Sequence, residues 1–238
     1  MVKFKLLNLL KVEPLVGICD MKKHSLGIIE KFFSKNPNLD HFKLTMIHAV
    51  DLLTKNFYKG GKILVCGNGG SAADSEHIVG ELMKGFVLNR NIKNETLNKI
   101  KVFFPSEVDN FMNNLQIGIP AISLVSQTGL ITAFNNDKNS DYVYAQQVFS
   151  YGKPNDTLFC LSTSGNSNNV LNAAKISKVL GIPVVGFTGS NGGKLKELSD
   201  YLFNVPSMVT SEIQEFHLPI YHTICLALEE ELFGVESI

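Results

Sequence analysis

The chain of 238 residues carries 22 Lys and Arg against 22 Asp and Glu, so its formal net charge is zero and its pI is near 7.0. This balance argues against a partner nucleic acid, because duplex binders normally carry a basic excess on one face. With 45% hydrophobic and 18% charged residues the chain is not disordered, and we expect one large α/β domain with apolar surface buried between subunits.

The chain shows no sign of a membrane partner. No stretch approaches the roughly 20 consecutive apolar residues of a membrane helix. Residues 1–16 do not read as a signal peptide, because Lys11 and Glu13 interrupt the apolar run and no small-residue cleavage site follows. We therefore expect a cytoplasmic protein. The cysteines lack CxxC spacing, so no disulfide framework or zinc ribbon is indicated, and Cys66 and Cys160 are expected in the core.

The predicted elements alternate after an all-helical start. Two helices are marked by apolar residues at helical spacing: Leu26, Ile29 and Phe33, then Met46, Ile47, Val50, Leu53 and Phe57. An Asn-Pro-Asn loop at 36–38 separates them. Strands are expected at 63–66, 121–125, 158–161, 184–187 and 201–205, with helices at 72–84, at 170–180 and from about Tyr221 to near Gly234. Continuous apolar strands alternating with helices predict a doubly wound parallel sheet.

Residues 88–118 do not follow this rhythm. Their charged residues alternate with weakly periodic apolar ones, including Phe103 and Phe104. We interpret the segment as a helical insertion between the first two strands, and a flexible lid is the second interpretation.

Two strand-to-helix junctions, 66–71 and 162–167, are rich in Gly, Ser and Asn. Glycine lets backbone N–H groups approach an anion, and a helix N-terminus adds a favourable dipole. The hydroxyls of Ser162, Thr163, Ser164 and Ser167 exceed the needs of one N-cap, so we expect phosphate at the second junction. For the first junction, a simple tight turn is an equally good interpretation.

A nucleotide cofactor is not expected. Residues 67–72 match GxGxxG/A, but the dinucleotide fold also needs an acidic residue about 20 positions further on. Residues 86–91 contain no acid, and neither junction ends in the GK[ST] of a P-loop.

Polar residues on two helices form candidate chemical groups. His77 and Glu81 are four apart and share a helix face, although an arbitrary pair of this kind is more often a surface pair. Gln214, His217 and His222 gather near the C-terminus. Pro219 is expected to kink or start a helix, so a helical wheel does not place Gln214 relative to His222. Imidazole and carboxylate serve as general acid and base or bind a divalent metal.

From Lys62 onward the sequence resembles the SIS (sugar isomerase) domain and, within it, the phosphoheptose isomerases. The matching stretches are CGNGGSAADSEHIVGEL at 66–82, NND at 135–137, STSGNSNNV at 162–170 and IQEFHLPIYH at 213–222. The resemblance implies a flavodoxin-like sheet of five parallel strands in an SIS domain over 42–238, with a helical extension over 1–41. It also implies a homotetramer with sites near subunit interfaces.

The same resemblance implies roles for particular residues. Glu81 matches the family's general base and His222 its general acid, while His77, Glu81, Gln214 and His222 match a zinc site of some members, so the two roles compete for the same side chains. The implied substrate-binding residues are Asn68, Gly69, Gly70, Ser71, Asn136, Asp137, Ser162, Thr163, Ser164, Ser167 and Gln214. The sequence departs from the family pattern in three places: the long insertion, residues 1–20 and Pro219. None of these departures removes a catalytic side chain.

The implied activity is an aldose–ketose isomerase that converts sedoheptulose 7-phosphate to D-glycero-D-manno-heptose 7-phosphate through an enediol. One alternative is the isomerisation of another ketose phosphate, such as a hexulose 6-phosphate. The other is a non-catalytic SIS protein, either a sugar-phosphate sensor or an adaptor for a replication initiator. Glu81 and His222 favour the enzyme, because such adaptors typically lack both, and the sequence has no helix-turn-helix region for a transcriptional sensor.

Overall fold

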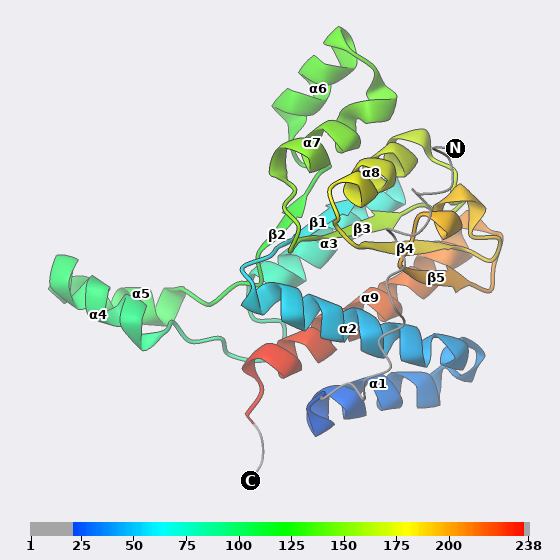
Figure 1. Cartoon of the computed structure of the whole chain (residues 1–238). Coiled ribbons are helices and arrows are strands. Elements are labelled where there is room, and N and C mark those ends of the chain that lie inside the picture. The colour runs from blue at the N-terminus through cyan, green and yellow to red at the C-terminus, as the bar shows by residue number, and fades with distance from the viewer. Residues whose placement is uncertain (1–20, 236–238) are drawn as a thin grey trace, which may run out of the picture.

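The computed structural model describes residues 21–235, and in them a single parallel sheet forms the centre of the fold (Figure 1). Its strands are β1 Ile63–Cys66, β2 Ala121–Ser123, β3 Thr157–Leu161, β4 Val184–Gly189 and β5 Tyr201–Val205. They are parallel throughout, in the order β2-β1-β3-β4-β5. This is the flavodoxin-like order, so the predicted fold class is confirmed.

The central strands are buried on both faces. Every residue of β1, β3 and β4 is buried, as expected for a parallel sheet covered by helices on both sides. Cys66 pairs in register with Cys160, and their Sγ atoms lie 3.9 Å apart. Both cysteines are completely buried, which confirms their predicted place in the core.

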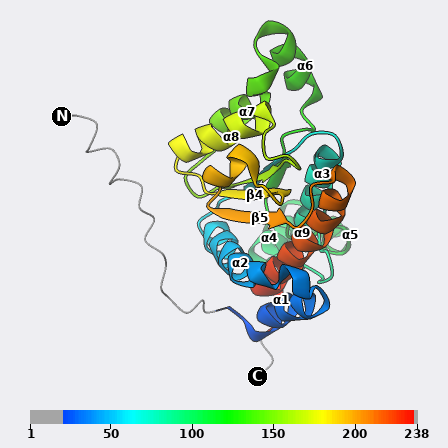
Figure 2. The ribbon, with the colours of Figure 1, turned by 90° about the vertical axis from the view of Figure 1, so that its right-hand side faces the viewer.

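Helices cover the sheet unequally. One face packs against α2 Lys43–Tyr58, α3 Gly70–Met83 and α9 Thr210–Phe233, and α1 Lys23–Lys35 packs in turn on α2 and α9. The other packs against α7 Val143–Tyr151 and α8 Asn168–Val179. Figure 2 shows these layers above and below the sheet. Short 3₁₀ turns occur at Pro37–Phe42, Pro105–Glu107, Ser140–Tyr142 and Gly193–Glu197.

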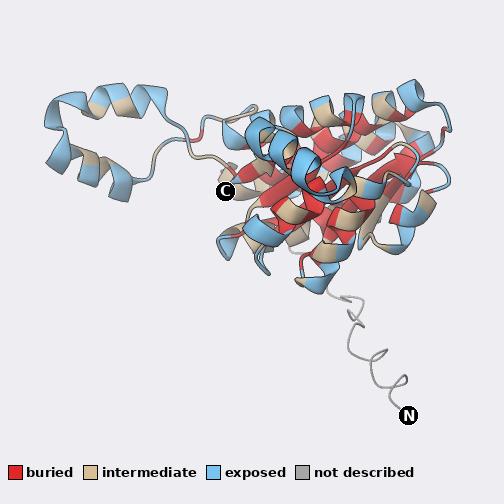
Figure 3. Cartoon of the chain, turned by 90° about the horizontal axis from the view of Figure 1, so that it is seen from above, coloured by how far each residue is buried: buried red, intermediate tan, exposed pale blue. Residues whose placement is uncertain are grey.

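Two helical segments project from this body. Residues 94–114, here called the arm, contain α4 Asn94–Phe103 and α5 Val108–Asn114, and no residue of either helix is buried (Figures 1 and 3). Helix α6, Thr128–Asp137, also extends away from the sheet and has no buried residue. The proposed division of the chain at residues 41 and 42, and the status of 88–118 as an insertion, stay predictions.

Helix α9 runs unbroken past Pro219. It begins at Thr210, so the expectation that Pro219 starts a helix is wrong. Proline lacks the N–H that would bond one turn back, but packing holds the helix in place, because ten of its residues are buried. The Thr223 hydroxyl donates to the Pro219 carbonyl at 2.7 Å. One continuous helix therefore carries Gln214 and His222.

Candidate active site

Three of the predicted site residues meet between α3 and α9. Each helix follows a strand of the parallel sheet, and both pack on the same face. His77 Nε2 on α3 lies 3.3 Å from His222 Nε2 on α9 and 3.3 Å from Glu81 Oε1, one turn along α3. These three side chains are here called the His77 cluster. The structure thus brings together the predicted base and the predicted acid around one imidazole.

The surroundings of the cluster keep His222 neutral near pH 7. Burial lowers the pKa of His222 below its usual value, and the nearby His77 lowers it further, whereas Glu81 opposes the shift. The ring of Phe86 covers His222 with 5.5 Å between ring centres. The Lys84 ammonium lies 3.0 Å from Glu81 Oε2. A neutral imidazole beside a carboxylate suits proton transfer near neutral pH.

Two further side chains lie on the Nδ1 side of His77, away from Glu81 and His222. The Tyr221 hydroxyl donates to Asp74 Oδ1 at 3.0 Å and lies 3.2 Å from His77 Nδ1. Burial raises the pKa of Asp74, and the bond from Tyr221 and the proximity of His77 oppose that shift. Sequence reasoning missed both residues. The available signal was the spacing, since Asp74 precedes His77 by three residues and therefore shares its helix face.

Gln214 lies at the other end of α3. A Cβ atom at Gly70 would stand 2.5 Å from Gln214 Nε2, so the end of the Gln214 side chain lies directly against Gly70 and would have to move for any larger residue there. Gly70 and His77 are seven residues apart, which is about 10 Å along a helix axis. The placement of Gln214 therefore favours its predicted contact with substrate over its predicted role as a zinc ligand.

The first glycine-rich loop is tied to α8. Gly69 adopts a left-handed conformation with φ of +57°. The Asn68 amide exchanges two hydrogen bonds with Asn169, at 2.8 and 2.9 Å. The Tyr144 hydroxyl donates to the Gly67 carbonyl at 2.8 Å. Asn169 and Tyr144 thus hold the loop of the predicted sugar-binding residue Asn68, and sequence reasoning missed both. Ser71, at the start of α3, is buried.

The second loop, 162–167, lies between β3 and the start of α8. Gly165 adopts a φ of +64°, and a Cβ there would lie 2.1 Å from the Gly192 carbonyl oxygen, so only glycine fits. Ser162 Oγ donates to Ser167 Oγ at 3.1 Å, directly before α8. A cavity of about 210 Å³ adjoins the loop, lined by Thr163, Ser164, Asn166, Gly189, Asn191, Gly192, Met208, Thr210 and Ile213. Hydroxyls at a helix N-terminus suit a bound phosphate.

Asn136 and Asp137 do not join the His77 cluster within one chain. They end α6, where Asn136 Nδ2 donates to Asp137 Oδ1 at 2.9 Å, and both are exposed. Figure 1 shows that α6 carries this end away from the sheet.

The cluster has the donor types of a zinc site. Around a tetrahedral zinc ion, nitrogen and oxygen ligands lie about 2.0–2.1 Å from the metal and therefore about 3.3 Å from one another. The His77–Glu81 and His77–His222 pairs have this spacing. As placed, however, no three His, Cys, Asp or Glu side chains among residues 21–235 are grouped as a metal site. The pairs fit a zinc ion, and the full ligand set would have to gather around it.

A parallel flavodoxin-like sheet with a hydroxyl-rich loop after β3 and a His–Glu cluster between two helices defines a class, the SIS-domain phosphosugar isomerases. In agreement, the SIS domain family profile matches residues 39–103 and 100–189. The chain belongs to the phosphoheptose isomerase family of this class, which confirms the resemblance seen in the sequence.

Relatives named phosphoheptose isomerase match most of the chain. One from Crocosphaera subtropica is 36% identical over 89% of this chain and 92% of its own length, and one from Synechocystis sp. is 38% identical over 80% and 84%. Among solved structures, the phosphoheptose isomerase of Neisseria gonorrhoeae has a TM-score of 0.66 at 30% identity, covering 87% of this chain and 97% of that one. The non-catalytic alternatives are not favoured by these relatives.

Proposed function

We propose that the chain converts sedoheptulose 7-phosphate to D-glycero-D-manno-heptose 7-phosphate in the cytoplasm. The observation that carries this proposal is the His77 cluster, in which a carboxylate and a neutral imidazole both lie 3.3 Å from Nε2 of His77. The names of the relatives support the heptose over another ketose phosphate. None of the helices in the described part of the chain combines the length and hydropathy that a membrane span requires.

The chemistry follows from the two proposed catalytic groups. Glu81 takes the proton from the carbon beside the substrate carbonyl, which gives an enediol, and then returns a proton to the neighbouring carbon. His222 moves a proton between the two substrate oxygens. Because its pKa is lowered, the imidazole is neutral near pH 7 and can accept that proton. Neither step changes the net composition of the sugar phosphate.

The second loop holds the phosphate in this proposal, through Ser162, Thr163, Ser164 and Ser167. Phosphate binding remote from the reacting carbons positions them for proton transfer. The sugar chain contacts Asn68, Gly69, Gly70 and Ser71, in the first loop, and Gln214, which packs on Gly70.

We further propose that the active form is a homotetramer. Asn136 and Asp137 are predicted to bind the sugar, yet α6 carries them away from the cluster of their own chain. A site that takes these two residues from a neighbouring copy accounts for this separation. The formal net charge of zero is consistent with surface that is covered in an assembly.

Zinc is the metal we propose for the cluster, where His77, Glu81 and His222 would hold it. Ligation and proton transfer compete for the Glu81 and His222 side chains, because a lone pair bound to zinc cannot accept a proton. Bound zinc would polarise the substrate carbonyl as a Lewis acid. Gln214, the fourth residue of the sequence prediction, lies by Gly70 and would have to turn toward the cluster to complete the set.

The test is the conversion of sedoheptulose 7-phosphate by purified wild type, Glu81→Gln and His222→Ala, with a hexulose 6-phosphate as the competing substrate. We expect each variant to lose about 10²–10⁴-fold in kcat/KM, which is the usual contribution of a positioned acid or base. The matched controls are Glu30→Gln and His48→Ala, exposed residues of α1 and α2 that are expected to retain full activity. A folded, assembled wild type that fails to convert the heptulose, with or without added zinc, would refute the proposal.

A further inference from the structure

The direction of the hydrogen bonds behind His77 can be assigned from Asp74. A carboxylate only accepts hydrogen bonds, and a tyrosine hydroxyl has a single proton to donate. Tyr221 gives that proton to Asp74 Oδ1 at 3.0 Å. Its oxygen can therefore only accept from the next group, His77 Nδ1, which lies 3.2 Å away.

This direction decides which nitrogen of His77 carries the proton. A neutral imidazole has one N–H and one bare nitrogen. With the proton on Nδ1, the bare nitrogen is Nε2, the atom that lies 3.3 Å from both Glu81 Oε1 and His222 Nε2. A lone pair on Nε2 is what a metal ion at the centre of the cluster needs.

We propose that Asp74 and Tyr221 are positioning residues that hold His77 as its Nδ1–H tautomer, with the Nε2 lone pair directed into the cluster. This inference rests on the proposed function and specifies how the cluster is prepared for its cation. Neither residue touches the reacting atoms, and both act through His77.

Packing fixes the orientation of the bridging hydroxyl. Tyr221 is completely buried. Its ring meets His77 edge-on with 5.7 Å between ring centres, and it meets His222 edge-on at 5.0 Å. The hydroxyl therefore stays between Asp74 and His77, and the far oxygen of Asp74, Oδ2, is buried with no hydrogen-bond partner in the structure.

The alternative is a purely structural role, in which Tyr221 only fills space between α3 and α9. The variant Tyr221→Phe separates the two roles, because it keeps the ring and removes the hydroxyl. Once the hydroxyl is gone, Glu81 Oε1 is the acceptor within reach of the imidazole, so the proton is expected to move to Nε2. Asp74→Asn acts differently, since its amide can donate to Tyr221 and let the hydroxyl donate to Nδ1.

The first measurement is the tautomer of His77 by nitrogen NMR on the metal-free full chain, at a pH above the ordinary histidine pKa of about 6.5. We expect Nδ1–H in wild type and Nε2–H in Tyr221→Phe and Asp74→Asn. The control Tyr58→Phe makes the same chemical change at an exposed residue of α2 and is expected to match wild type. An Nε2–H signal in wild type, or no change in Tyr221→Phe, would overturn the inference.

The second measurement is the zinc dissociation constant by competition with a chelator. Loss of a residue that orients a metal ligand typically weakens binding about 10–100-fold, and we expect that loss for Tyr221→Phe but not for Tyr58→Phe. Equal affinities in wild type and Tyr221→Phe would also overturn the inference. Failure of the proposed zinc site has a different signature, because wild type would then bind no zinc while the tautomer switch remained. Failure of the proposed activity would appear only in the conversion assay.

Discussion

His217 lies one turn before Tyr221 on α9 but faces the sheet instead of the His77 cluster. Its Nε2–H donates to the Thr188 carbonyl at 3.2 Å, and its ring packs edge-on against Phe187. Burial lowers the pKa of His217 to about 4, and the bond to Thr188 only partly opposes this shift. The group of nearby polar residues that the sequence suggested therefore divides: His217 packs in the core, and His222 lies in the His77 cluster, where its chemical role is proposed.

The depressed pKa of His217 predicts a stability that depends on pH. In the unfolded chain a histidine titrates near 6.5, so the unfolded state binds more protons than the folded state between about pH 6.5 and pH 4. The contribution of His217 to the free energy of unfolding is therefore fully present above pH 6.5 and is lost as the pH falls toward 4. From pH 7.5 to pH 5 we expect the free energy of unfolding to drop by about 2 kcal/mol on this account.

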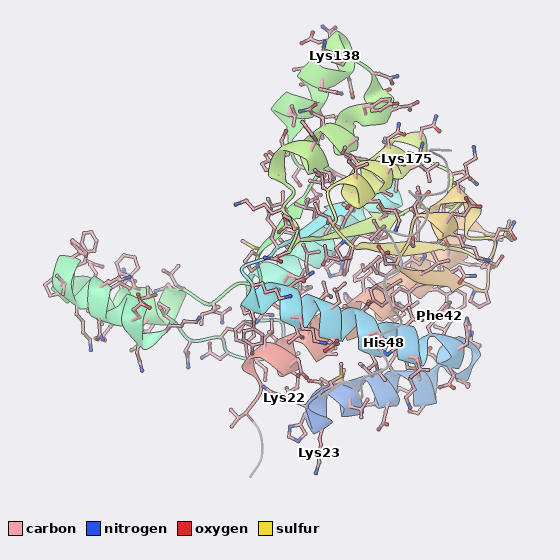
Figure 4. The ribbon with its side chains drawn as sticks, in the orientation of Figure 1. Lys22, Lys23, Phe42, His48, Lys138 and Lys175 are labelled. Carbon is pink, nitrogen blue, oxygen red and sulfur yellow. The ribbon has the colours of Figure 1, made fainter. Side chains whose placement is uncertain are left out.

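Chemical denaturation of wild type and His217→Gln at pH 7.5 and pH 5 measures this drop in the free energy of unfolding. Glutamine keeps an N–H for the Thr188 carbonyl but does not titrate, so the drop should shrink by about 2 kcal/mol. His48→Gln removes an exposed histidine on α2, labelled in Figure 4, and should leave the drop unchanged. The same drop in wild type and His217→Gln would show that His217 is not the responsible group.

Single residues also mark the limit of what the sequence shows about the site. Glu81 and His222 were predicted as site residues because their motifs resemble those of a known family. Asp74 and Tyr221 were not found, because their contact joins residues 147 positions apart and depends on how α3 packs against α9. Local spacing places a residue on a helix face, but only tertiary packing places it opposite a partner.

At the scale of elements, α9 anchors the segment that follows α3. Glu229 Oε1 accepts from the Phe86 amide at 2.8 Å, and its Oε2 accepts from those of Val87 and Leu88 at 2.8 and 3.1 Å. Arg90 Nε donates to Glu229 Oε1 at 2.8 Å, and both residues are only 1% exposed. Burial raises the pKa of Glu229, but these hydrogen bonds outweigh it and hold the pKa below its usual range.

Removal of Arg90 is expected to destabilise the fold strongly. Arg90→Met leaves a buried carboxylate without its cation, which typically costs about 3–5 kcal/mol. The matched control is Lys99→Met on the arm, which breaks an exposed pair with Glu95 and should cost under about 1 kcal/mol. Urea denaturation of the two variants measures both values. Similar small losses in both would show that the buried pair contributes little to stability.

Elements were predictable where their pattern is local. Strands β1 and β5 lie at the predicted residues, and the others differ by at most two residues at an end, because continuous apolar runs between turn signals define them. The continuous α9 was not predictable from Pro219, since tertiary burial outweighs the local preference of proline. The position of α6 was not predictable either, because nothing in its sequence shows that it projects from the body.

At the scale of the whole molecule, residues 21–235 expose apolar side chains in several places, and two of these places concern assembly. One is the arm, where Val102, Phe103 and Phe104 are 77%, 72% and 55% exposed. The other is a hollow of about 640 Å³ between α6, α7 and α8, lined in part by Phe134, Tyr142, Phe149 and Val179. The arm carries both acidic and basic residues, whereas Lys138 and Lys175 line the hollow (Figure 4). Apolar surfaces of this kind mark interaction sites.

The proposed homotetramer therefore predicts that the arm contributes to assembly and not to the fold of one chain. Substitution of Val102, Phe103 and Phe104 by serine removes largely exposed side chains, of which Phe104 packs on Phe111 within the arm itself, so thermal unfolding of the body should change little. Their loss from an interface should raise the dissociation constant of the assembly at least about tenfold, the equivalent of about 1.4 kcal/mol. Sedimentation velocity over a concentration series measures this constant. Serine at Glu95 and Lys99, exposed polar residues of the same arm, should leave it unchanged. If the apolar triple variant assembles as wild type does, the arm lies outside the interface, and copies must meet elsewhere.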